Sequence, residues 1–332
     1  MKTYTARRIH FEGFPTRPNR VSKDVIVYPK KAIWINCFFD FDVLWIRYDK
    51  HFEEYTALAH ECGKIIFFNK EWASDMWEKE LEVSREAADA AGKTLMRMVG
   101  KVAFKTKNSG TDLVTKADLD AERIILEVIE KNYPKDNILS EEAGKRDHMG
   151  KRTWIIDPLD GTTNFAHGFP FFAVSIALEV ENKIVLGVVY NPWMDEYFEG
   201  VEGMGASLNK SPIQVSNVST LREALLGTGF PYSIHKEPER VIGLFKRMVL
   251  KAQGVRRAGS AAIDLCYLAA GRIDGFWEED LKPWDTAAAM VIIKEAGGKI
   301  STFEGEAYTP YEKTIMAANP HIYNNMIEAL NT

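Results

Sequence analysis

The chain has 332 residues, of which 46% are apolar and 27% charged, as in a globular protein with one large or two ordinary domains. Its net charge of −5 argues against a nucleic-acid partner held by bulk charge. The most apolar run, residues 33–48, carries three charged side chains, and the N-terminus lacks a secretory core, so no membrane association is expected. Three cysteines without metal-ligand spacing, Cys37, Cys62 and Cys266, are typical of reduced thiols in a cytoplasmic protein.

Residues 1–75 differ from the rest of the chain. They are rich in aromatic and basic residues but show no sustained helical or strand period. The segment is either a mispredicted upstream extension or a lineage-specific appendage. Its irregular pattern and widely spaced prolines favour poor order over an extra domain.

A regular pattern begins at Met76. Apolar residues at helical spacing predict a helix up to Met98, and a second helix is expected from an N-cap at Asp118 to Pro134. Strands are predicted next at Asn137–Leu139, Trp154–Ile156, Phe172–Val180, Lys183–Tyr190 and Asp195–Glu199, with a hairpin around Glu181-Asn182.

Strands and helices alternate from about residue 221. The predicted strands are 224–227, 254–257, 271–277 and 314–318, and the predicted helices are 239–251, one after Ser260, one from Pro283 to Gly297, and one after Pro320. We therefore expect an N-terminal α+β domain over 76–220, with a mainly antiparallel sheet, and a C-terminal α/β domain over 221–332.

The most informative motif is the run Trp154–Phe165. An apolar strand ends in Asp157 and Asp160, followed by Gly161 and two hydroxyl residues. Pro158 predicts a turn that points both carboxylates to the same side. Paired carboxylates repel unless protons or cations lie between them, and oxygen ligands favour magnesium, manganese or calcium over zinc.

Three further acidic sites lie at strand or helix ends. Asp118 closes the segment that begins at Lys107, Glu141-Glu142 follow a predicted strand, and Asp285 lies in the first turn of a helix. Taken singly, each has a structural explanation: an N-cap, a solvated turn and a complement to the helix dipole. The Asp157/Asp160 pair has no such explanation.

These motifs carry a family resemblance. From Met76 to the C-terminus the chain resembles the inositol monophosphatase family of lithium-sensitive, magnesium-dependent phosphatases. The matching segments, in chain order, are residues 107–118, Glu141-Glu142, Asp157-Pro158-Leu159-Asp160-Gly161-Thr162 and Trp284-Asp285-Thr286-Ala287-Ala288. The resemblance implies a five-layered αβαβα sandwich, of the α+β or α/β class, and a homodimer.

The resemblance also implies a set of metal ligands. About two or three Mg²⁺ ions, or Mn²⁺ as a substitute, would be held by Glu141, Asp157, Asp160, Asp285 and the carbonyl of Leu159. Asp157 would bridge two ions. One ion would activate a water, and another would neutralise the leaving alkoxide.

By the same resemblance, Glu141 would hold or deprotonate the attacking water. Thr162, oriented by Asp118, would hydrogen-bond to it, and Lys107 would support it, although Lys107 could equally be a solvated loop lysine. The amides of Gly161 and Thr162 would hold the phosphate.

The alcohol half of the substrate would face residues that lie mainly in the C-terminal domain. These are Gly259, Ser260 and Ala261, together with Asp160 and with Glu278, which would accept hydrogen bonds from the hydroxyls. Ser260 stands where many relatives carry threonine, and Glu278 could instead belong to an acidic surface loop. His167 is expected to be a loop or interface residue rather than a general acid.

The expected activity is hydrolysis of a phosphate monoester of a polyol, with inositol-1-monophosphate as the best single substrate. The alternatives are fructose-1,6-bisphosphatase or a dual activity, histidinol-phosphatase and 3′-phosphoadenosine-5′-phosphate phosphatase. A non-enzymatic alternative is a binding factor in a transcription complex.

Overall fold

The computed structural model describes residues 25–26, 34–36, 55–60, 64–101, 104–106, 113–148 and 150–332. The chain divides into two compact units, Met1–Met76 and Trp77–Thr332.

Among its described residues, the first unit contains four antiparallel strands. They are β1 (Val25–Ile26), β2 (Trp34–Asn36), β3 (Tyr55–His60) and β4 (Lys64–Asn69), in the order β1-β2-β4-β3. Helix α1 (Lys70–Met98) begins six residues before the expected position at Met76. The prediction of poor order for this extension concerns residues that mostly lie outside the described part of the chain.

An eight-stranded sheet forms the first layer of strands in the second unit. Its order is β14-β13-β12-β11-β10-β9-β7-β8, and all neighbours are antiparallel except β7 and β9. The strands are β7 (Asn137–Ser140), β8 (Gly144–Arg146), β9 (Arg152–Asp160), β10 (Ala173–Val180), β11 (Lys183–Asn191), β12 (Glu196–Val201), β13 (Gly205–Leu208) and β14 (Ser211–Pro212). The predicted hairpin is confirmed, because Glu181 and Asn182, with φ of 50° and 65°, form the turn between β10 and β11.

A five-stranded mixed sheet follows in the C-terminal half, as the alternating pattern predicts. Its order is β16-β15-β17-β19-β18. The strands are β15 (Leu225–Thr228), β16 (Gly254–Arg256), β17 (Gly275–Glu279), β18 (Lys299–Ser301) and β19 (Thr314–Ala318). A separate small ladder pairs β5 (Phe104–Thr106) with β6 (Leu113–Thr115).

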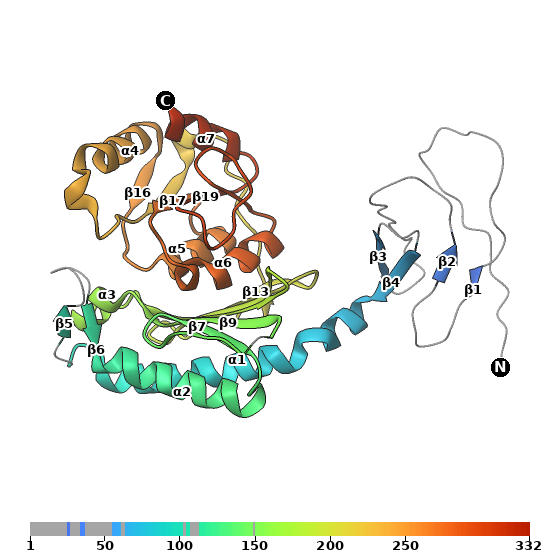
Figure 1. Cartoon of the computed structure of the whole chain (residues 1–332). Helices are drawn as coiled ribbons and strands as arrows, with labels where there is room; N and C mark the ends of the chain where they lie inside the picture. Colours follow the sequence, from blue (N-terminus) through green and yellow to red (C-terminus); the bar gives the residue numbers. More distant parts are fainter. Residues whose placement is uncertain are drawn as a thin grey trace, which may run out of the picture. The chain divides into compact units, whose positions relative to one another are not determined.

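The helices complete five layers (Figure 1). One apolar core joins α1 and α2 to one face of the eight-stranded sheet, a second lies around α5 and α6 on its other face, and a third joins the five-stranded sheet to α4 and α7. The helices are α2 (Lys116–Asn132), α3 (Thr162–Ala166), α4 (Pro238–Lys251), α5 (Ala261–Ala269), α6 (Pro283–Glu295) and α7 (Tyr323–Asn331), with short 3₁₀ turns at Leu221–Glu223 and Ile234–Lys236. The expected αβαβα sandwich is confirmed. None of the helices in the described residues is long and apolar enough to span a bilayer.

Helix α6 is the most enclosed of these elements. Every residue from Thr286 to Ile293 is buried, and the helix packs against α5 and against β10, β11 and β12. A helix that is apolar on all sides is stable only inside a core. Because α6 belongs to the second predicted half but packs on the sheet of the first, the two halves share one interior, and the division at residue 220 stays a prediction.

Strand β9 continues beyond its expected end at Ile156. Ser175 of β10 pairs with Asp157, whereas Ala173 pairs with Asp160, so β9 carries one extra residue at this point. Pro158, which has no amide hydrogen to donate to the ladder, lies inside this bulge. The predicted turn at Pro158 is therefore wrong, because pairing with β10 carries the strand through to Asp160.

Candidate active site

The turn after β9 brings the central motif against α2. Gly161 has a φ of 87°, and a Cβ at this position would lie 2.9 Å from the carbonyl oxygen of Phe171. The next residue, Thr162, donates its hydroxyl to Asp118 Oδ1 at 3.0 Å and to the carbonyl of Leu159 at 3.1 Å. The structure thus brings Asp118, Leu159 and Thr162 into contact, and the contact of Asp118 with Thr162 is the one that the family resemblance implied.

Asp118 itself lies elsewhere in its helix than expected. Helix α2 begins at Lys116, so Asp118 belongs to its first turn, where it is buried, rather than to the N-cap. The N-cap prediction is therefore wrong. Instead of capping its own helix, the carboxylate of Asp118 accepts a hydrogen bond from Thr162, in a different segment of the chain.

The four predicted metal-binding carboxylates act on one another. Burial, followed by the charges of Glu141, Asp160 and Asp285, raises the pKa of Asp157 well above its usual value. Burial raises the pKa of Asp160 to about 6, although hydrogen bonds from Ser260 and the backbone oppose that shift. Burial and the charges of Asp160 and Glu141 likewise raise the pKa of Asp285. Acidic residues far apart in the sequence therefore converge electrostatically.

Asp157 and Asp285 each use one oxygen to fix their own loop. Asp157 Oδ1 accepts from the Leu159 amide at 2.9 Å, and Asp285 Oδ2 accepts from the Lys282 amide at 2.6 Å. The second oxygen of Asp157 and that of Asp285 form no hydrogen bond with any described residue. These oxygens are available to an external ligand.

The donor set fits a hard divalent cation in charge and chemistry. The groups are carboxylates, they repel one another, and burial disfavours their charged forms, so a cation between them would relieve both costs. Within the described residues, no three His, Cys, Asp or Glu side chains are arranged around a common point as ligands of one ion. The assignment of individual ligands is therefore a proposal.

The predicted alcohol-binding segment lies next to the central motif. Asp160 Oδ2 accepts from the Ser260 hydroxyl at 2.5 Å and from the Ala262 amide at 2.8 Å. Asn164 Nδ2 donates to the carbonyl of Ala258 at 2.9 Å. These bonds place the start of α5, with Gly259, beside the turn that follows β9.

Glu278 lies on β17 and is only 9% exposed, so it is a buried strand residue and does not belong to an acidic surface loop. Burial raises its pKa, and the charges of Asp264, Asp285 and Asp160 act in the same direction. A Cβ at Gly229 would lie 2.0 Å from a carboxylate oxygen of Glu278. Glycine at 229 is therefore required for Glu278 to occupy this position.

Several residues near the site were not identified from the sequence. Asp264 of α5 is 4% exposed, and Asp160 adds to the effect of burial in raising its pKa. Arg257 is exposed, its guanidinium lies 5.8 Å from the Phe230 ring centroid, and its charge lowers the pKa of Asp264 and of Glu278. Arg257 forms no hydrogen bond or ion pair with any described residue. In the sequence, only the position of Arg257 two residues before Gly259 could have suggested that it lies near the site.

The two remaining residues that the sequence analysis discussed are Lys107 and His167. Lys107 lies outside the described residues. His167 follows α3 and is exposed, as expected for a loop histidine.

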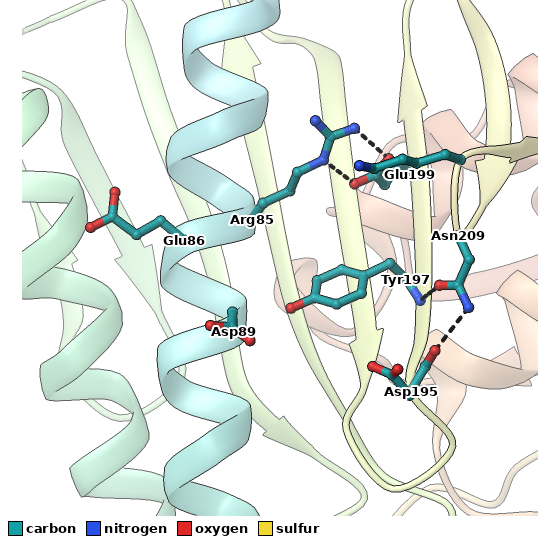
Figure 2. A pocket seen from close by; sticks show the side chains of 8 residues that line it. Arg85, Glu86, Asp89, Asp195, Tyr197, Glu199 and Asn209 are labelled. Carbon is teal, nitrogen blue, oxygen red and sulfur yellow. Dashed lines mark hydrogen bonds and ion pairs between the residues drawn. The ribbon is translucent and has the colours of Figure 1, made fainter.

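A cavity of about 480 Å³ lies elsewhere, between α1 and the β12–β13 hairpin (Figure 2). None of the predicted site residues lines it. Arg85 binds Glu199 through two nitrogens, at 2.5 and 2.7 Å, and Asn209 bridges the Tyr197 amide and the Asp195 carbonyl. These internal bonds give its polar side chains a structural role.

The comparison with protein-family models decides the family. Residues 76–332 match the model described as the inositol monophosphatase family. The chain belongs to the inositol monophosphatase family. Members of this family are phosphoric monoester hydrolases that use metal ions.

Individual relatives agree with this assignment. An inositol-1-monophosphatase of Synechocystis sp. is 44% identical over 252 residues, which cover 75% of this chain and 88% of the relative. The Nus factor SuhB of Vibrio cholerae is 40% identical over 243 residues, covering 72% and 91% of the two chains. The crystal structure of the suppressor protein suhB from Bartonella henselae has a TM-score of 0.73 at 40% identity, covering 76% and 99%.

Proposed function

We propose that the protein hydrolyses a phosphate monoester of a polyol in a Mg²⁺-dependent reaction, with inositol-1-monophosphate as the preferred substrate. The observation that carries this proposal is the convergence of Glu141, Asp157, Asp160 and Asp285 from three separate parts of the fold, where the charges of the other three raise the pKa of Asp157 and those of Glu141 and Asp160 raise the pKa of Asp285. The relatives named inositol-1-monophosphatase support the choice of substrate.

Glu141, Asp157, Asp160, Asp285 and the Leu159 carbonyl would hold the cations. About two or three Mg²⁺ ions, when bound, would supply charge neutralisation and an activated water. Phosphoryl transfer depends mainly on positioning and charge stabilisation, which agrees with a site built from fixed carboxylates.

The remaining groups would orient the reactants. Glu141 accepts the proton of the attacking water, and the Thr162 hydroxyl, fixed by Asp118, directs that water. The amides of Gly161 and Thr162 donate to the phosphate.

The alcohol half is bound on the opposite side of the motif. Gly259, Ser260 and Ala261 face the ring at the start of α5, and Glu278 accepts hydrogen bonds from its hydroxyls. Burial strengthens such bonds, because an unpaired hydroxyl inside the site costs about 1–3 kcal/mol.

A substrate panel tests the proposal. Wild type and Asp157→Asn would be assayed with Mg²⁺ on inositol, fructose, histidinol and nucleotide phosphates. Turnover of inositol-1-monophosphate by the wild type alone is the expected result. If the wild type hydrolysed none of these esters, the alternative function as a binding factor would be favoured. Relatives named Nus factor SuhB suggest that such a factor would act in a transcription complex.

A second candidate substrate is fructose-1,6-bisphosphate. The exposed guanidinium of Arg257, unpaired with any described residue, lies beside Gly259 and Phe230 at the alcohol-binding segment. A guanidinium binds a phosphate through two parallel hydrogen bonds, so this position suits a substrate with a second phosphate.

We also propose a homodimer, a cytoplasmic location and inhibition by lithium. Sedimentation of the purified protein, and activity measured against Li⁺ at fixed Mg²⁺, test the first and the last of these properties.

A further inference from the structure

The turn that carries Glu141 is held by a buried carboxylate of α2. Glu122 is 6% exposed. Its Oε1 accepts hydrogen bonds from the amide of Glu142 at 3.1 Å, from the amide of Ala143 at 2.9 Å and from the hydroxyl of Ser140. The three donors surround Glu141 in the sequence, so Glu122 fixes the backbone on both sides of it.

The same turn is tied to the central motif. The amide of Glu141 donates to the carbonyl of Ile156 at 3.2 Å, one residue before Asp157. Hydrogen bonds to an ionised carboxylate are about twice as strong as neutral ones, and without Glu122 the partly buried amides of Glu142 and Ala143 would lose this acceptor. Glu122 therefore stabilises one particular path of the turn.

Two carboxylates of α2 hold two different parts of the site. Asp118 binds Thr162, in the turn after β9, and Glu122, four residues later, binds the turn that carries Glu141. Residues four apart lie on the same face of a helix at a nearly fixed separation. Helix α2 thereby sets the distance between the two turns.

We propose that Glu122 is a positioning residue that fixes Glu141 in the orientation needed to bind a divalent cation together with Asp157. The inference rests on the proposed function, since Glu141 is a metal ligand only there. Outer-shell partners of metal ligands contribute about 10–100-fold to metal affinity or activity.

The test compares Glu122→Gln with Glu127→Gln. Glu127 lies on the same helix, but its side chain is 63% exposed and pairs with Arg123. Mn²⁺ binding is measured by titration calorimetry, and the Mg²⁺ concentration for half-maximal activity is measured separately. Roughly tenfold weaker Mn²⁺ binding and a similar rise in the Mg²⁺ requirement are expected for Glu122→Gln alone. Its KM for substrate at saturating Mg²⁺ should equal that of the wild type.

A milder variant protects the test against a loss of folding. Ser140→Ala removes one of the three donors to Glu122 and should weaken Mn²⁺ binding by roughly threefold, with the protein still folded by circular dichroism. Wild-type Mn²⁺ affinity in both Ser140→Ala and a folded Glu122→Gln would overturn the inference and leave the proposed function standing. If the wild type itself bound no Mn²⁺, the proposed function and the inference would both be wrong.

Discussion

The hydroxyl of Thr162 lies 3.0 Å from the carboxylate of Asp118 and joins the turn after β9 to the first turn of α2. A hydroxyl that donates to a carboxylate presents its lone pairs elsewhere, so Thr162 can accept a hydrogen bond from a water. Asp118 is buried, and this bond therefore fixes the direction in which the Thr162 oxygen points.

Replacing Thr162 by valine should lower kcat by roughly 100-fold, because valine keeps the shape but has no hydroxyl to direct a water. Thr162→Ser keeps the hydroxyl and is the matched control, with at least about one tenth of the wild-type kcat expected. Equal activity of Thr162→Val and wild type, in a steady-state phosphate-release assay, would exclude this role.

Replacing Asp157 by asparagine should separate activity from stability. Activity should fall by roughly 1000-fold, since several kcal/mol of metal-based charge stabilisation are lost. In EDTA, however, the variant should be more stable than wild type, by on the order of 1 kcal/mol, because one of several mutually repelling buried charges is removed.

Thermal unfolding in EDTA measures this effect. Asp147→Asn is the control, because Asp147 is exposed and pairs with Lys145. A Tm for Asp157→Asn below that of wild type in EDTA would contradict the expected repulsion.

The stability of the metal-free protein should depend on pH through the same carboxylates. The pKa of Asp160 is about 6, and those of Asp157 and Asp285 are also raised. Between the ordinary aspartate pKa near 4 and about 6, the folded state binds more protons than the unfolded state, so their contribution to stability falls as pH rises through this range.

Urea unfolding in EDTA at pH 5 and pH 7.5 measures this dependence. The free energy of unfolding of wild type, relative to Asp157→Asn, should be higher at pH 5, and millimolar Mg²⁺ should remove the difference by replacing the protons. If the free energy of unfolding of wild type, relative to that of Asp157→Asn, rose towards pH 7.5 in EDTA, the result would be incompatible with raised pKa values.

Gly229→Ala should impair substrate binding more than catalysis. The added Cβ would lie about 2 Å from the carboxylate of Glu278, which must then move away from the alcohol-binding segment. We expect KM for inositol-1-monophosphate to rise roughly tenfold, because the substrate loses one hydrogen bond to a charged group, and we expect a smaller change in kcat. Gly243→Ala, at an α4 glycine with no heavy atom near the added Cβ, is the control.

Arg257→Gln should distinguish monophosphate from bisphosphate substrates. If Arg257 binds a second phosphate, kcat/KM for fructose-1,6-bisphosphate should fall roughly tenfold or more, while that for inositol-1-monophosphate stays close to wild type. Arg256→Gln is the matched control, because Arg256 is exposed and its side chain bonds to the neighbouring carbonyl of Val255. Equal losses on both substrates would count against a second phosphate subsite.

Much of the fold follows from local sequence patterns. The β10–β11 hairpin was predictable because two apolar runs rich in β-branched residues flank Glu181-Asn182, and both of these residues adopt the positive φ that such turns require. The start of α6 was predictable from Pro283 at its first turn. Where local signals and tertiary pairing agree, the expected elements are found.

The errors have a common physical cause. Pro158 and two aspartates looked like the end of a strand, yet pairing with β10 carries β9 past them. The role of Glu122 was missed altogether, because nothing local shows that its carboxylate binds residues 140–143. Both depend on partners distant in the sequence, which a local pattern does not reveal.

The enclosure of α6 has a consequence for the motions of the site. Its backbone amides are hydrogen-bonded within a helix surrounded by two sheets, so they should exchange with deuterium only when the whole unit unfolds. Asp285, at the start of that helix, is then anchored to a segment that unfolds locally only rarely. Glu141, in contrast, lies on a short turn that follows the end of β7. Any adjustment of the site to ions of different radius should therefore come from the Glu141 side.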